Sequence, residues 1–70
     1  MQSSLGITLN GKPRRVRAGS TLGDLMHELG LGEAAVAVEK NHALVRRGEQ
    51  ALTALAEGDE IEVVTLVGGG

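Results

Sequence analysis

Residues 20–30, STLGDLMHELG, form the best-defined element of the chain. Their apolar residues fall at positions i, i+3, i+4 and i+7, the spacing that lines one face of an α-helix. These residues are Leu22, Leu25, Met26 and Leu29. Thr21 and Asp24 have the spacing of a capping box, and Gly30 suits the position just after a helix C-terminus. The stretch therefore predicts a short helix with one apolar face and defined ends.

The residues before this helix predict a β-hairpin. Leu5, Ile7 and Leu9 alternate with smaller or polar residues, as in a strand that is buried on one face. Asn10-Gly11 follows, a pair that favours a type I′ turn because both central residues of that turn need positive φ. A second strand is expected through residues 15–17, with Val16 turned inward.

The residues after the helix predict two strands, a short helical segment and a final strand. Val36 and Val38 alternate in a strand of about five residues, and residues 43–45 suit a short strand. Residues 49–60 predict a helical turn or two that carries Leu52 and Leu55 and ends at the Gly58-Asp59 turn. The element order is therefore ββαββ, a short helix and a last strand, in one domain.

The last strand covers residues 61–67. One of its faces carries Ile61, Val63 and Thr65, and the other carries Glu62, Val64 and Leu66. If the first face packs against the helix, then Val64, Leu66 and Val67 are on the other side of the strand. They either contact a docking partner or are covered by a loop, and the sequence favours the two interpretations equally.

Composition excludes several classes of function. The 70 residues contain no cysteine, which rules out disulfides, thiolate nucleophiles and cysteine-based metal sites. The chain has no aromatic residue and a net charge of −2, which argues against a nucleic-acid module. No apolar run approaches the roughly 20 residues of a membrane span, and no signal peptide is visible, so a cytoplasmic protein is expected.

No catalytic or metal constellation stands out. His27 and His42 lie in different elements without metal-ligand spacing, and His27 falls on the polar side of the helix. Ser20 and Thr21 fit helix capping better than nucleophilic catalysis. We therefore expect neither an enzyme nor a metal centre.

Two charged runs have simple interpretations. KPRRVR, residues 12–17, carries four cations, which are interpreted as guards of a sheet edge in preference to an anion site. EGDEIE, residues 57–62, carries four acids, and a solvated acidic turn is favoured over an electrostatic guide for a basic partner.

The chain ends in Gly68-Gly69-Gly70. Three extended residues reach roughly 10 Å, and a tail without β-carbons can enter a narrow crevice. A phosphate loop is excluded because no helix follows these glycines. The carboxylate of Gly70 is then the one distinctive chemical group, which predicts an acyl carrier that works through its own C-terminus.

Four stretches in order carry a resemblance to the ubiquitin-like β-grasp family and, more narrowly, to the ThiS sulfur carriers of thiamine biosynthesis. They are ITLNGKP (7–13), AGSTLGDLMHELGL (18–31), VAVEKN (36–41) and EGDEIEVVTLVGGG (57–70). The resemblance implies an α+β fold in which a mixed sheet of about five strands packs on one main helix. It also implies a β-grasp domain over residues 1–67 and a flexible glycine tail over residues 68–70.

The resemblance further implies a function as a carrier. A ThiF-type E1-like enzyme would use ATP to adenylate Gly70, and a sulfur donor such as a cysteine desulfurase would convert it to a thiocarboxylate. A ThiG-type thiazole synthase would then accept the sulfur, and the carrier itself would bind no cofactor. Gly68, Gly69 and Gly70 would thread into the partners, and the docking approach would be lined by Val64, Leu66 and Val67.

Three alternatives remain open at this point. A sister carrier for molybdopterin or cysteine synthesis would share the chemistry and differ in the acceptor. A ubiquitin-like modifier would instead join the Gly70 carboxylate to protein lysines. A plain interaction module would have a glycine end that is not native to it.

Overall fold

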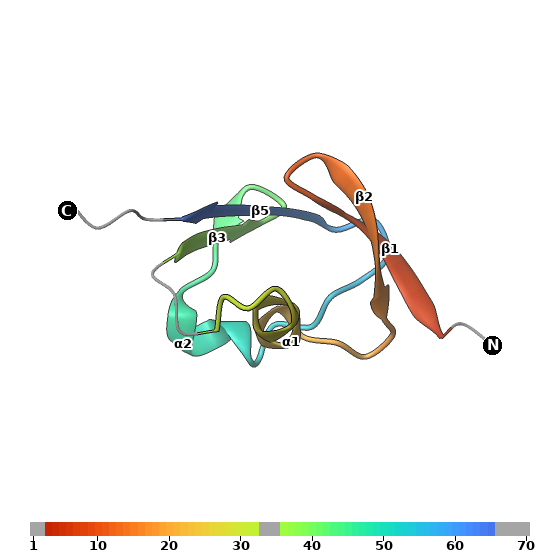
Figure 1. Cartoon of the computed structure of the whole chain (residues 1–70), viewed down its shortest axis with the longest axis horizontal. Coiled ribbons are helices and arrows are strands. Elements are labelled where there is room, and N and C mark those ends of the chain that lie inside the picture. Colours follow the sequence, from red (N-terminus) through yellow and green to blue (C-terminus); the bar gives the residue numbers. More distant parts are fainter. Residues whose placement is uncertain (1–2, 33–35, 66–70) are drawn as a thin grey trace.

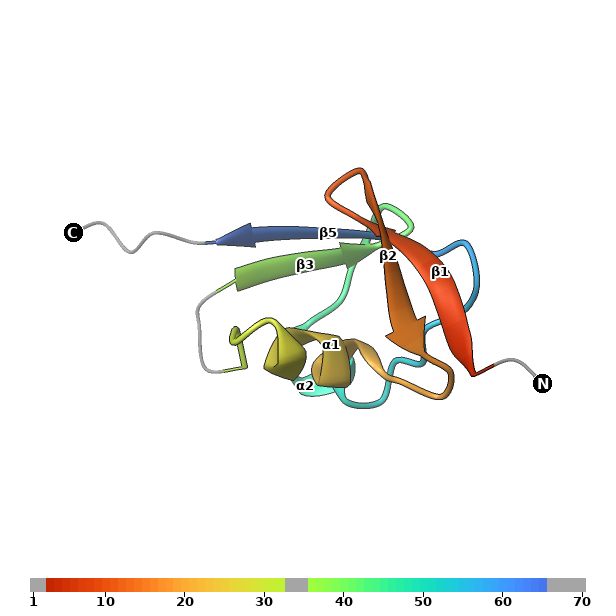
Figure 2. The same ribbon diagram turned by 45° about the vertical axis from the view of Figure 1, so that its right-hand side comes forward.

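The computed structural model describes residues 3–32 and 36–65. Their elements, in chain order, are β1 (Ser4–Leu9), β2 (Lys12–Arg17), α1 (Leu22–Glu28), β3 (Val36–Lys40), β4 (Ala43–Leu44), α2 (Arg47–Gln50) and β5 (Glu60–Thr65). The strands form one sheet in the order β2-β1-β5-β3-β4, in which β1 and β5 are parallel and the other neighbours antiparallel. Both helices lie on the same face of this sheet (Figures 1 and 2). The predicted α+β fold with a mixed five-stranded sheet is confirmed.

The turn and cap signals of the N-terminal half are confirmed. Asn10 and Gly11 have φ of 51° and 82°, as a type I′ turn requires. The Thr21 amide donates to Asp24 Oδ2 at 2.9 Å, and the Asp24 amide donates to Thr21 Oγ1 at 3.1 Å, which completes the capping box. Gly30 follows the helix with φ of 76°, a conformation that costs glycine little.

The core lies between the sheet and α1. Its buried apolar residues come from every layer of the fold: Ile7, Val16, Leu22, Leu25, Met26, Val38, Leu55 and Ile61. Leu5, Leu9 and Leu29, also expected to face inward, are half-buried against this cluster. Within the described residues, no helix is long and apolar enough to cross a membrane.

The segment between β4 and β5 differs from the prediction. α2 ends at Gln50, Leu52 is 85% exposed, and Gln50 is buried in its place. The expectation that a helix carries Leu52 and Leu55 together is wrong.

The reason is a pairing between the residues after α2 and the start of α1. The Leu22 amide donates to the Thr53 carbonyl at 2.8 Å, and the Leu55 amide donates to the Ser20 carbonyl at 3.0 Å. This extended pairing replaces helical periodicity, so Leu55 enters the core while Leu52 stays outside it.

Candidate functional site

The predicted site lies at the end of β5, and the structure describes one part of it. Val64 is in β5 and is 60% exposed, while Ile61 is fully buried and Val63 is half-buried against the core. The alternation predicted for this strand therefore holds through Val64. Leu66, Val67 and Gly68–Gly70 lie outside the described residues, so their predicted roles remain predictions.

β5 occupies the middle of the sheet, yet its backbone pairing with β1 is short. Only Thr8↔Glu60 and Leu9↔Ile61 are in register. The side chain of Asn10 then continues this ladder, because its Oδ1 accepts from the Val63 amide at 2.8 Å and its Nδ2 donates to the Val63 carbonyl at 3.3 Å. The Asn10 side chain thus makes the hydrogen bonds to Val63 that the next residue of β1 would otherwise make. These bonds fix β5 beside the hairpin turn.

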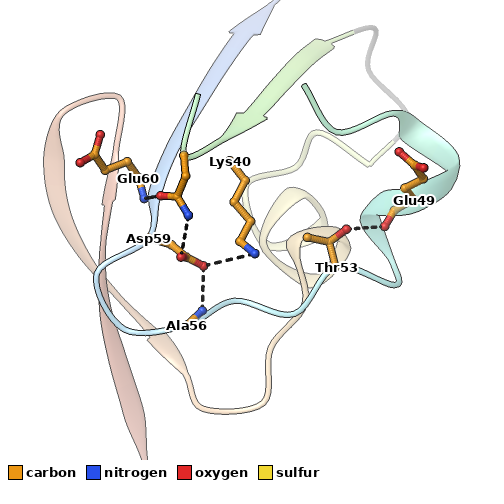
Figure 3. A network of polar contacts seen from close by, with 7 residues as sticks. Lys40, Glu49, Thr53, Ala56, Asp59 and Glu60 are labelled. Carbon is orange, nitrogen blue, oxygen red and sulfur yellow. Dashed lines mark hydrogen bonds and ion pairs between the residues drawn. The ribbon is translucent and has the colours of Figure 1, made fainter. Parts of the chain in front are cut away.

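A second asparagine, Asn41, holds the beginning of β5 from the side of β3. Figure 3 shows Asp59 of the same network with its partners Ala56 and Lys40. Asn41 Oδ1 accepts from the Glu60 amide at 2.8 Å, and Asn41 Nδ2 donates to Asp59 Oδ1 at 3.0 Å. The other oxygen of Asp59 accepts from the Ala56 amide at 2.8 Å and lies 3.9 Å from Lys40 Nζ. Asp59 is buried, so its carboxylate is a structural acceptor that joins the β3–β4 turn to the loop before β5.

This network corrects the interpretation of residues 57–62 as a purely solvated acidic turn. Asp59 is buried in the network, and Glu57 Oε1 accepts from the Gly6 amide of β1 at 2.9 Å. Glu57, Glu60 and Glu62 are the exposed acids of the run, so only Asp59 departs from a solvated position.

Three apolar side chains lie on the face of the sheet that the helices leave open, and they are called the open-face patch: Ala37, Leu44 and Val64. Val64 is opposite Ala37 in β3, and two residues further along β3, Glu39 is opposite Leu44 of β4. Residues directly opposite each other share a face, so all four side chains belong to the open face. Leu44 is 64% exposed. The sequence did not single out Leu44, because a two-residue strand is too short to show which of Leu44 and Val45 turns inward.

Acidic and basic side chains lie on different strands of the open face. Glu39 and Glu62 lie opposite each other beside the apolar patch, whereas Arg15 and Arg17 are exposed on β2 at the sheet edge. β2 is an edge strand, as the interpretation of the cationic run requires, and Arg14 of this run pairs with Glu28 of α1 at 3.1 Å. The area around Val64 therefore presents apolar groups with negative charge beside them, which suits a partner surface that is apolar and basic.

The other candidate groups have structural or surface positions. Thr21 caps α1, the Ser20 carbonyl accepts from Leu55, and His27 is exposed on α1. His42 lies in the β3–β4 turn, where the fold brings it near Glu39 and Glu62. Sequence spacing could not reveal this group, because the β3–β5 pairing joins residues more than 20 positions apart.

Comparison with known proteins agrees with this architecture. The model of the ThiS family matches residues 7–70, which is nearly the whole chain. The chain belongs to the ThiS family. A crystal structure of the thiamine biosynthesis protein ThiS from Geobacter metallireducens superposes with a TM-score of 0.80 at 30% identity, covering 94% of this chain and all of that one. The ubiquitin-like β-grasp fold expected from the resemblance is confirmed.

Two longer relatives contain a segment similar to this ThiS-family chain. A thiazole synthase from Magnetococcus marinus is 48% identical over 64 residues, which make up 91% of this chain and 20% of that protein. A thiazole synthase from Paramagnetospirillum magneticum is 38% identical with the same coverage. The chain thus spans about one fifth of the length of these relatives.

Proposed function

We propose that this chain is the sulfur carrier for the thiazole moiety of thiamine, and that Gly70 is the group that carries the sulfur. The observation that supports this most directly is the ThiS-family match, which extends to Gly70 at the chain end. The sequence offers no cysteine side chain to hold the sulfur, which supports the Gly70 carboxylate as the proposed carrier group.

The proposed reaction sequence needs three partners. A ThiF-type enzyme transfers AMP from ATP to the Gly70 carboxylate and releases pyrophosphate. The outer sulfur of a persulfide, for example on a cysteine desulfurase, attacks the acyl adenylate and displaces AMP, which gives an acyl disulfide. A thiol then reduces the S–S bond, which releases the thiocarboxylate on Gly70 and leaves a disulfide between the thiol and the sulfur donor. A ThiG-type thiazole synthase takes up that sulfur, and the carrier is released with its carboxylate restored. The carrier is thus a co-substrate and not an enzyme.

The two longer relatives support thiazole synthase as the acceptor. Both are thiazole synthases, and in each of them a segment similar to this chain makes up one fifth of the protein. Joining a carrier to its acceptor raises the effective concentration of one for the other, which is useful when the two must meet in every cycle. We infer that this chain meets an acceptor of the same kind.

The proposed docking surface is the open-face patch of Ala37, Leu44 and Val64. It includes Val64 of β5, the strand that precedes residues 66–70 in the chain. The Asn10 and Asn41 contacts fix β5 relative to this patch. A fixed strand reduces the conformational freedom that binding must remove from β5, which favours docking of the patch.

An intact-mass measurement tests the carrier chemistry. The protein is incubated with ATP, a ThiF-type enzyme and a sulfide source, beside a variant that lacks Gly70. We expect a mass change equal to replacement of one oxygen by sulfur in the full chain and none in the deletion variant. Isopeptide conjugates without any thiocarboxylate would identify a protein modifier instead. Thiocarboxylate that a molybdopterin or cysteine pathway enzyme accepts, and that thiazole synthase refuses, would reassign the acceptor.

Surface variants test the docking patch. Val64→Ser and Leu44→Ser should raise the KM of the activating enzyme for the carrier while leaving thermal stability within about 0.5 kcal/mol, because both residues are exposed. Leu52→Ser is the control, since Leu52 is an exposed leucine outside the sheet, with 85% of its surface accessible against 64% for Leu44. Equal effects of all three substitutions on KM would contradict a patch on the open face.

A further inference from the structure

Three side chains with metal-binding atoms converge at the acidic end of the open face. Glu39 and Glu62 are cross-strand partners in β3 and β5, and His42 lies in the turn that follows β3. One ligand atom from each of the three lies within 4.8 Å of the other two. The group combines an imidazole with two carboxylates and lies apart from the tail chemistry.

The backbone holds His42 in this position. Asn41 and His42 have φ of 52° and 71°, so both residues of this tight turn are left-handed, a conformation that asparagine and histidine adopt more often than most other residues with a side chain. The neighbouring Asn41 is tied to Asp59 and Glu60 by the hydrogen bonds described above. The Nε2 atom of His42 also lies 3.2 Å from Glu60 Oε1. The imidazole is therefore held from the backbone side and by a carboxylate at one ring nitrogen.

The charge balance of the group is unfavourable without a cation. Like charges directly opposite each other in an antiparallel pair destabilise a sheet. In the described part of the chain, neither Glu39 nor Glu62 takes part in an ion pair, and the cation next to Glu39 in sequence, Lys40, lies beside Asp59. Three carboxylates, Glu39, Glu60 and Glu62, thus surround a single imidazole.

We propose that Glu39, His42 and Glu62 form a binding site for a divalent transition-metal ion such as Zn²⁺. One imidazole nitrogen and one oxygen from each carboxylate bind the ion, and water completes the coordination shell. Glu60 holds the other ring nitrogen, as carboxylates commonly do for metal-binding histidines. The imidazole selects Zn²⁺ and its transition-metal neighbours over Ca²⁺ and Mg²⁺, which prefer oxygen ligands.

The three ligand atoms need to move only slightly closer together to bind one ion. Tetrahedral zinc bonds of about 2.0–2.2 Å place neighbouring ligand atoms roughly 3.3–3.6 Å apart. The spread of up to 4.8 Å shrinks to this range by rotation of glutamate side chains, and Glu62 is solvent-exposed and free to rotate. The cross-strand pairing keeps the two backbones in register, so the ion links β3 and β5 across a pair that already exists.

Calorimetric titration of the full chain with Zn²⁺ tests the proposal. We expect saturable binding of one ion, a loss of affinity of about tenfold in Glu60→Gln, and a larger loss in His42→Asn and in Glu62→Gln. His27→Asn is the matched control, because it removes the other histidine of the chain, which is exposed on α1. It should leave the affinity unchanged.

A second measurement locates the ion independently of affinity. Cu²⁺ should broaden the amide NMR signals of residues 39, 42 and 62 first, while Mg²⁺ at the same concentration should leave them unchanged. These substitutions are at the surface, so retained amide dispersion shows that each variant is folded. Binding of Zn²⁺ that is equal in His42→Asn and the parent, or that His27→Asn abolishes, would overturn the proposal.

Discussion

Replacing Asn10 by glycine should weaken the attachment of β5 to β1. The substitution keeps a residue that accepts positive φ in the turn and removes both contacts to Val63. A net hydrogen bond contributes about 0.5–1.5 kcal/mol. Because the bond at 3.3 Å is long and belongs at the low end of that range, we expect a loss of about 1–2 kcal/mol in the free energy of unfolding. For a domain of this size the loss lowers Tm by at least about 4 °C.

Thermal unfolding and amide hydrogen exchange measure this effect globally and locally. The Val63 amide should exchange faster in Asn10→Gly, because its acceptor is the removed side chain. His42→Gly is the control for introducing glycine, since His42 is also left-handed and its side chain makes an exposed contact with Glu60. That variant should be neutral or more stable.

The reasoning also predicts a functional consequence. If Asn10 positions the strand that leads to Gly70, then Asn10→Gly should lower kcat/KM for adenylation more than His42→Gly does. Unchanged Tm together with unchanged protection of the Val63 amide would refute the assignment of Asn10 as the clamp of β5.

Three further substitutions probe the packing. Leu25→Ala truncates a fully buried side chain and should cost about 2–5 kcal/mol in denaturant unfolding, enough to unfold much of so small a domain. Gly23→Ala favours the helix by up to about 1 kcal/mol, but its β-carbon would lie 3.0 Å from Ala51 Cα, so calorimetry should show a lower Tm. A higher Tm would show that the loop after α2 shifts to make room for the added methyl group. Asp59→Ala leaves the Ala56 amide and Asn41 Nδ2 without their acceptor and should cost about 2–4 kcal/mol; a loss under 0.5 kcal/mol would mean that water replaces the carboxylate.

Local sequence signals predicted most of the fold. The apolar spacing around Leu25, the Thr21–Asp24 capping box and the Asn10-Gly11 turn all act within a few residues of themselves. Alternation in β5 correctly placed Ile61 inside and Val64 outside. Such signals depend only on local backbone geometry and on the period of the apolar residues. They can therefore be recognised without knowing how the rest of the chain folds.

The segment after β4 could not be predicted in the same way. Leu52 and Leu55 are three residues apart and look helical, but the pairing of residues 53–55 with residues 20–22 decides which leucine is buried. Gln50 is buried for a related reason, since α1 approaches the backbone at Ala51 through Gly23. These outcomes depend on contacts between residues about 30 positions apart in the sequence. The spacing of apolar residues within one segment does not reveal such contacts.

The same division applies to the site. The sequence by itself determined the glycine end, the absence of cysteine and the outward face of Val64, because these follow from residue identity and strand period. Only the tertiary structure decided that Leu44 joins Val64 on the open face, that Asn10 and Asn41 hold β5, and that Glu39, His42 and Glu62 meet. Each of these depends on the register between strands distant in the chain, and register is set by the packing of the whole sheet against α1.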